Sequence, residues 1–173
     1  MKKVIFFDGD GTLWEPISDK YSEPWHIYQD LGANPFTHCR PTAKSLETLK
    51  AVGKKGIKRV LLSTSPLPSK QAIQHRMKIV ESMGLKGLID DIQVSPDYPE
   101  GKSEKITELL KLYKIDKKDA LMVGDMYKWD YKPAKDVGVD ALLLEKKYSY
   151  KHYEKNSSIV TISQIQDVLD YLK

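Results

Sequence analysis

The sequence predicts an α/β fold in which one parallel β-sheet carries helices on both faces, in three layers and without a large additional domain. Short apolar runs recur along the chain, and stretches with apolar residues at helical spacing lie between them. Strands that alternate with helices are typical of a parallel sheet. The length of 173 residues suits one domain with a substantial core. We therefore expect residues 1–173 to form a single domain.

The expected strands are five short apolar runs, residues 3–7, 58–62, 89–94, 120–123 and 141–144. Helical spacing predicts helices over residues 41–53, 70–83 and 103–113. The second of these presents Ile73, Met77, Val80 and Met83 on one face. A C-terminal helix is expected to carry Ile165, Val168, Leu169 and Leu172 on one face, with Thr161 and Ser163 as capping candidates.

Two segments interrupt the alternation of strands and helices. Residues 14–40 are long for a connection and rich in aromatic residues and prolines, and long loops inside compact domains are usually functional or mobile. Residues 146–158 are basic and aromatic. Neither segment has the composition of a linker, so we interpret residues 14–40 as a short aromatic insertion.

Composition limits the classes of function. No apolar stretch approaches the ~20 residues of a membrane span, and the first residues lack the apolar core of a signal peptide. Cys39 is the only cysteine, which excludes an intramolecular disulfide and favours a reducing compartment. We therefore expect a cytoplasmic protein without a membrane partner. The net charge of +4 favours anionic ligands but is too small to indicate nucleic-acid binding by itself.

The most informative motif is the apolar run at residues 4–7, which ends in Asp8 and Asp10 on a turn with Gly9 and Gly11. Ligands bind at the carboxyl ends of the strands in open parallel sheets. One carboxylate there can attack phosphorus while the other handles a proton, and Mg2+ prefers hard oxygen ligands of this kind. Because Asp and Gly are also ordinary turn residues, the motif alone leaves a solvated turn open.

Three further signals lie at strand ends or helix starts. Ser63 and Thr64 follow an apolar run, where hydroxyl and amide groups suit a phosphoryl oxygen, although Ser63 taken alone is better explained as an N-terminal cap. Lys102 precedes a predicted helix and by itself is one surface lysine among many. Asp125 and Asp130 follow another strand, and Asp125 could complete a Mg2+ site or be a turn acid.

Taken together and in this order, DGDGT, LLSTS, GKSEK and VGDMYKWD resemble the motifs of the haloacid dehalogenase-like (HAD) superfamily of phosphohydrolases. The resemblance covers residues 4 to about 144 and implies a Rossmann-like sheet. It implies that Asp8 is the nucleophile that becomes a transient aspartyl phosphate, and that Asp10 is the general acid and base. The phosphoryl group would be held by Ser63, the amide of Thr64 and Lys102. Mg2+ would be bound by Asp8, Asp125 and the backbone carbonyl of Asp10, with Asp130 orienting its waters and Lys102.

The resemblance also narrows the reaction. Members that cleave carbon–halogen bonds usually lack the second aspartate, so Asp10 argues against dehalogenation. A phosphomutase would need the same pair but generally carries a substantial cap domain. Residues 14–40 are too short for one, and residues 66–101 are expected to hold only one helix, one strand and a loop. The chain is therefore similar to capless members of the magnesium-dependent phosphatase type. That type often has a hydrophobic residue in place of Gly9 and two adjacent acids in place of the GD motif.

The leading hypothesis is therefore a Mg2+-dependent phosphomonoesterase that acts on a phosphorylated small molecule or phosphoprotein. Two alternatives are a receiver-like phosphate-binding module without turnover and a phosphatase for nucleic-acid ends. The aromatic residues Trp14, Trp25, Tyr28 and Phe36 are expected mainly to pack the insertion onto the core, and otherwise to form a lid or platform. The spacing of His26, His38 and Cys39 matches no four-ligand zinc pattern. Residues 146–155 are expected to be a solvated loop, which could otherwise attract a phosphorylated polymer.

Overall fold

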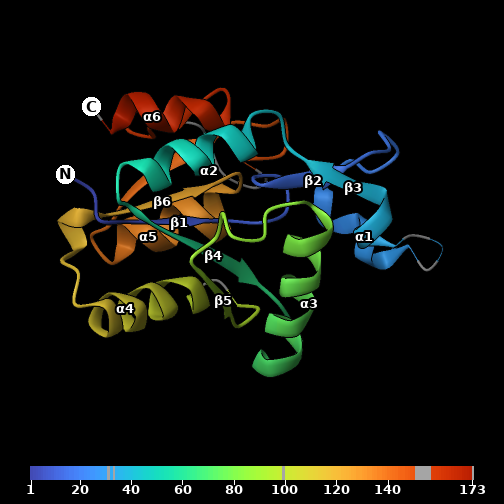
Figure 1. Ribbon diagram of the computed structural model, residues 1–173, viewed down its shortest axis with the longest axis horizontal. Coiled ribbons are helices and arrows are strands. Elements are labelled where there is room, and N and C mark those ends of the chain that lie inside the picture. Colours follow the sequence, from blue (N-terminus) through green and yellow to red (C-terminus); the bar gives the residue numbers. More distant parts are fainter. Residues whose placement is uncertain (31, 33, 99, 151–156, 173) are drawn as a thin grey trace.

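The computed structural model describes residues 1–30, 32, 34–98, 100–150 and 157–172. Its centre is a six-stranded sheet in the order β5-β4-β1-β6-β7-β8, and every neighbouring pair is parallel (Figure 1). The strands are β1 (Val4–Phe7), β4 (Lys58–Thr64), β5 (Asp91–Ser95), β6 (Ala120–Gly124), β7 (Asp140–Leu144) and β8 (Thr161–Ile162). This sheet confirms the predicted α/β fold class, including the five strands expected from the apolar runs.

Helices cover both faces of the sheet. The side chains of β1 are fully buried and alternate between two apolar clusters. Ile5 and Phe7 pack with residues of α2 (Ser45–Lys54), α3 (Ser69–Ser82) and the C-terminal segment, which comprises a 3-10 helix (Ile165–Asp167) and α6 (Val168–Tyr171). Val4 and Phe6 pack with residues of α4 (Gly101–Tyr113) and α5 (Lys132–Asp136). In Figure 1, α2 and α6 lie above the sheet and α4 below it.

The register of the central strands determines which side chains meet at the carboxyl edge. Phe7 pairs with Leu61 of β4 on one side and with Val123 of β6 on the other. Asp8, Ser63 and Asp125 follow these residues and therefore lie at nearly the same level, at the carboxyl edge of the sheet. The order of the strands also reverses direction at β1, which is where open α/β sheets bind their ligands.

The insertion after β1 has its own small structure. Its two ends form an antiparallel pair of strands, β2 (Trp14–Pro16) and β3 (Cys39–Pro41). Between them lie a 3-10 helix (Pro24–Gln29) and α1 (Pro35–His38), at the right of Figure 1. The expected helix at residues 41–53 begins only at Ser45, because Pro41 pairs in β3.

Two other local predictions were wrong. On α3 the buried face comprises Ala72, Arg76, Ile79 and Val80, while the expected core residue Met77 is 54% exposed. Thr161 belongs to β8, and Gln164 with Asp167 forms the capping box at the C-terminal helix. The π-helix (Tyr127–Tyr131) that leads into α5 was not predicted at all. Among the described residues, no helix has the length and apolar character needed to cross a bilayer.

Candidate active site

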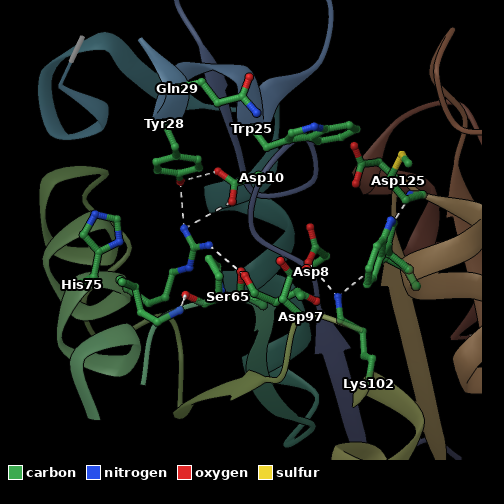
Figure 2. Close-up of a pocket in the computed structure, with 18 residues that line it drawn as sticks. Asp8, Asp10, Trp25, Tyr28, Gln29, Ser65, His75, Asp97, Lys102 and Asp125 are labelled. Atoms are coloured by element: carbon green, nitrogen blue, oxygen red, sulfur yellow. Dashed lines mark hydrogen bonds and ion pairs between the residues drawn. The ribbon is translucent and has the colours of Figure 1, made fainter. Parts of the chain in front are cut away.

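A cavity of about 630 Å3 opens at the carboxyl edge of β1, β4 and β6 (Figure 2). All seven residues that the sequence singled out line it: Asp8, Asp10, Ser63, Thr64, Lys102, Asp125 and Asp130. Residues from the insertion and from α3 complete its walls, notably Trp25, Tyr28, His75 and Arg76. The structure therefore brings together side chains that lie more than a hundred residues apart in the sequence.

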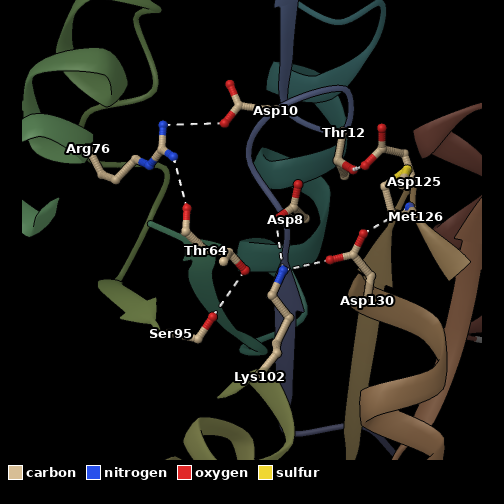
Figure 3. A network of polar contacts seen from close by, with 10 residues as sticks. All are labelled: Asp8, Asp10, Thr12, Thr64, Arg76, Ser95, Lys102, Asp125, Met126 and Asp130. Carbon is tan, nitrogen blue, oxygen red and sulfur yellow. Dashed lines mark hydrogen bonds and ion pairs between the residues drawn. The ribbon is translucent and has the colours of Figure 1, made fainter. Parts of the chain in front are cut away.

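Lys102 is the buried cation at the floor of the cavity. It lies in the first turn of α4 and is only 1% exposed. Its Nζ donates to Asp8 Oδ1 at 2.9 Å and to Asp130 Oδ1 at 2.6 Å (Figure 3). Burial opposes the charge on this lysine, but the two carboxylates outweigh that effect and raise the pKa of Lys102 above its usual value. Lys102 is therefore positively charged at neutral pH.

Asp130 is held in place through both of its oxygens. The π-helix carries it back toward the sheet, and its Oδ2 accepts a hydrogen bond from the Met126 backbone amide at 2.9 Å. Gly124 makes this approach possible, because a Cβ at that position would lie 2.3 Å from Asp130 Cγ. Asp130 thus fixes Lys102 as a second carboxylate partner beside Asp8.

Three buried carboxylates form an acidic cluster beside this lysine. Oxygen atoms of Asp8, Asp125 and Asp130 lie within 4.8 Å of one another, the only such group of potential metal ligands in the described part of the chain. Burial raises the pKa of Asp8 and the charge of Lys102 lowers it, and the net result is a pKa of about 7, above the usual value. Burial and the neighbouring carboxylates raise the pKa of Asp125 well above its usual value. Lys102 alone does not balance this charge, so the cluster fits a divalent cation that prefers oxygen ligands, such as Mg2+.

Asp125 also accepts hydrogen bonds from two hydroxyl groups. Thr12 Oγ1 lies 3.4 Å from its Oδ1, and Tyr148 donates to its Oδ2 at 2.7 Å. Gly11 lies directly against this pair, with a φ of +80° and no room for a side chain. Tyr148 also contacts the ring of Trp25 edge-on, at 5.6 Å between centroids. Tyr148 was not among the predicted site residues, although its position shortly after β7 places it at the same edge of the sheet.

The carboxylate of Asp10 lies apart from the acidic cluster and has contacts of its own. Its Oδ1 accepts hydrogen bonds from Trp14 Nε1 at 2.8 Å and from the Tyr28 hydroxyl at 2.6 Å. Its Oδ2 lies 3.3 Å from Nη1 of Arg76 (Figures 2 and 3). The two aspartates of the first motif therefore occupy different environments, Asp8 beside Lys102 and Asp10 beside Arg76.

The end of β4 forms another wall of the cavity. Ser63 is buried. The hydroxyl group of Thr64 is hydrogen-bonded to the hydroxyl group of Ser95 at 3.1 Å. The Thr64 carbonyl accepts from Arg76 Nη2 at 3.2 Å, and Ser65 Oγ accepts from the Leu67 amide at 3.2 Å. These contacts fix the turn that follows the strand.

The aromatic residues of the insertion divide between the core and the cavity. Trp14 is fully buried, and Phe36 packs against the core cluster, as expected for an insertion that is packed onto the domain. Trp25 and Tyr28 instead line the cavity. Burial raises the pKa of the Cys39 thiol to about 12, which argues against a reactive thiolate. Of the basic segment at residues 146–155, residues 151–155 lie outside the described part of the chain.

Comparisons with known proteins agree with this geometry. Residues 12–144 match the family model described as haloacid dehalogenase-like hydrolase. No curated protein matches the sequence. The fold is shared with an uncharacterized protein from Listeria monocytogenes serotype 4b, at a TM-score of 0.73 and 18% identity over 98% of this chain and 96% of that one.

The similar structures include a phosphatase and a dehalogenase. A predicted phosphoglycolate phosphatase from Haemophilus somnus 129pt has a TM-score of 0.70 and 18% identity, over 99% of this chain and 98% of that one. An L-2-haloacid dehalogenase from Xanthobacter autotrophicus, with chloropropionic acid covalently bound, has a TM-score of 0.68 and 12% identity over the same shares. At such identities these likenesses establish the fold alone. The match to the family model extends over well more than half of the sequence, and the chain therefore belongs to the haloacid dehalogenase-like hydrolase family.

Proposed function

We propose that this protein is a Mg2+-dependent phosphomonoester hydrolase in which Asp8 is the nucleophile. The observation that carries the proposal is the pairing of Asp8 with Lys102 inside the buried acidic cluster, with the second aspartate, Asp10, on the same cavity. A carboxylate, a fixed cation and a cation site around one cavity are what phosphoryl transfer needs, because its catalysis is mainly positioning and charge stabilisation.

Each side chain has a role in this proposal. An oxygen of Asp8 forms a bond to phosphorus as the bond to the leaving oxygen breaks, which gives an aspartyl phosphate. Asp10 donates a proton to the leaving oxygen and then accepts one from the water that attacks this phosphorus and releases Asp8. Ser63 Oγ and the Thr64 amide hold phosphoryl oxygens, and Lys102 balances their charge.

The acidic cluster supplies the ligands for the metal ion. Asp8, Asp125 and the backbone carbonyl of Asp10 would hold Mg2+, and Asp130 would orient Lys102 and the bound waters. When bound, Mg2+ shields the charge of the substrate phosphate from that of Asp8. Burial raises the pKa of Asp8 to about 7, so that without a further cation the carboxyl group is partly protonated at neutral pH. A divalent cation beside Asp8 would favour the ionised form, which is the form that attacks phosphorus, and this supports the assignment.

The substrate class follows from the cavity and the similar structures. A volume of about 630 Å3 is that of a small-molecule pocket. The predicted phosphoglycolate phosphatase among the similar structures points the same way. We propose a phosphorylated small molecule as the substrate and a single domain without a cap. In this proposal Trp25 and Tyr28 of the insertion, which line the cavity, partly cover the bound substrate.

The test is hydrolysis of p-nitrophenyl phosphate with Mg2+ or with EDTA, by the unaltered protein and by Asp8→Asn. Asp136→Asn is the matched control, because Asp136 lies on the surface in an ion pair with Lys132. Turnover that needs both Mg2+ and Asp8 supports the proposal, whereas full activity of Asp8→Asn overturns it.

The other reactions are tested in parallel. Chloride release from 2-chloropropionate would identify a dehalogenase instead. A long-lived phosphate on Asp8 without turnover would identify a receiver-like module. Preference for phosphorylated DNA or RNA ends, with strongly salt-dependent binding, would identify an end phosphatase.

A further inference from the structure

The carboxylate of Asp10 is held by donors from two elements outside the β1 motif and its own turn. The Tyr28 hydroxyl reaches it from the 3-10 helix of the insertion, and Arg76 reaches it from α3. We propose that Arg76 and Tyr28 are positioning residues that aim Asp10 at the leaving-group oxygen of the substrate. This inference rests on the proposed phosphatase function.

Arg76 is itself fixed in place. It is 6% exposed, and its guanidinium donates to the Tyr28 hydroxyl at 2.8 Å and to the Thr64 carbonyl at 3.2 Å. The guanidinium carbon also lies 5.4 Å from the centroid of the Tyr28 ring. These contacts join α3, the end of β4 and the insertion around one carboxylate: Figure 2 shows Tyr28 beside Asp10, and Figure 3 shows Arg76 between Asp10 and Thr64.

Stability alone does not account for a buried arginine at this position. A buried ion pair gains little over apolar packing of the same volume, because both charges lose their hydration. Here Arg76 Nε is also buried without an acceptor in the described part of the chain, which adds a cost. At position 76 an apolar side chain would pack better beside Ala72 and Ile79, which lie on the same buried face of α3. What the guanidinium provides is a fixed direction for the carboxylate it meets.

Tyr28 links the same carboxylate to the insertion. Its hydroxyl accepts from Arg76 and donates to Asp10, so the three groups form one chain of hydrogen bonds. Asp10 Oδ1 then accepts two short bonds, from Tyr28 and Trp14. Its Oδ2 has the longer contact of 3.3 Å to Arg76 and is the oxygen left to carry the transferred proton. Misplacing Oδ2 would impair proton transfer without removing Asp8 or the metal ligands.

The inference predicts a dependence on the leaving group. p-Nitrophenolate departs without protonation, whereas the alkoxide of β-glycerol phosphate must be protonated as it leaves. General acid catalysis contributes about 100- to 10,000-fold. We expect Tyr28→Phe and Arg76→Lys to lower kcat/KM for β-glycerol phosphate by roughly tenfold or more, part of that contribution. For p-nitrophenyl phosphate we expect kcat/KM to fall less than about threefold, because kcat/KM reports the steps through departure of the leaving group and not the later attack of water, in which Asp10 acts for both substrates.

Two matched controls make the same substitutions elsewhere. Tyr21→Phe removes a hydroxyl that donates to Asp30 at 2.8 Å within the same insertion. Arg59→Lys alters an ion pair with Asp90 at the amino end of β4. Both should leave the ratio of the two activities unchanged. In the background of Asp10→Asn, Tyr28→Phe should add no further loss, because it acts only through Asp10.

The outcomes are distinguishable. Equal losses of kcat/KM on both substrates, or no loss on either, overturns the inference while the phosphatase function stands. Absence of turnover by the unaltered protein overturns the proposed function and the inference with it. If Arg76→Lys fails to fold, Tyr28→Phe decides the question, because Tyr28 is 36% exposed and its ring is retained.

Discussion

Replacement of Lys102 by methionine should strongly destabilise the protein in the absence of metal. Lys102 Nζ lies 2.9 Å from Asp8 and 2.6 Å from Asp130, and all three groups are buried. At an effective dielectric constant of about 20, each contact provides about 6 kcal/mol of attraction, which offsets the cost of burying the charges. Removing one partner of a buried pair typically costs about 3–5 kcal/mol. In a chain of this size that corresponds to a fall in Tm of about 10 °C.

The loss of stability in Lys102→Met should be smaller at lower pH. Burial already raises the pKa of Asp8 from 3.8 to about 7, so the folded protein binds a proton here that the unfolded chain lacks between those values. That proton stabilises the folded state increasingly as the pH falls through 7. Without Lys102 the pKa of Asp8 rises further, because the lysine opposes the effect of burial. The variant should therefore recover part of its lost stability between pH 7.5 and pH 5.5.

Urea unfolding in EDTA at the two pH values measures this effect. Lys86→Met is the matched control, because Lys86 forms a similar 2.7 Å pair with Glu81 on the surface. Such exposed pairs contribute about 0–1 kcal/mol. A loss for Lys102→Met as small as that of the control, or one that is identical at both pH values, would refute the reasoning.

Three further predictions concern the same region. Gly11→Ala should lower kcat at least tenfold, because its Cβ would lie 2.0 Å from Asp125 Oδ2. The control is Gly56→Ala, because Gly56 has a similar φ of +71° but open space around it. This control should lower the free energy of unfolding by only about 1–2 kcal/mol, the strain of a left-handed backbone. Mg2+ at about 100 times its Kd should raise the free energy of unfolding by about 2.7 kcal/mol in thermal melts, and Asp125→Asn should abolish this increase. The Cys39 thiol should react with Ellman's reagent at pH 8 only slowly in the folded protein and rapidly in urea, because burial raises its pKa to about 12; rapid reaction of the folded protein would contradict this.

The motifs at the strand ends were predictable because parallel strands fix where their carboxyl ends meet. Asp8, Ser63 and Asp125 each follow an apolar run, and the register of three neighbouring strands brings them together. Their environment was not predictable in the same way. The separation of Asp10 from the acidic cluster depends on Arg76, which lies on α3 and is distant in sequence.

Arg76 also explains why the face of α3 was assigned incorrectly. Apolar spacing favoured Met77 as a core residue, yet the helix turns Arg76 inward to meet Asp10 and leaves Met77 exposed. The spacing of hydrophobic residues cannot predict that a charged side chain is buried because it pairs with another charge, as Arg76 does with Asp10. Tyr148 escaped prediction for a related reason, because no periodicity marks the loop residue that reaches a site.

The strand pair β2 and β3 has a consequence for how this site can change. Trp14 pairs with Pro41 and Pro16 with Cys39, so the two ends of the insertion are joined beside the cavity independently of what lies between them. Once such ends are closed, doubling the length of a flexible loop costs only about 0.6 kcal/mol of chain entropy. Segments of other lengths can therefore be grafted between residues 17 and 38 while Asp8, Lys102 and the acidic cluster keep their framework, provided that the graft retains Tyr28, which donates to Asp10. The strand pair thus lets the insertion vary in length without moving the residues at the floor of the cavity.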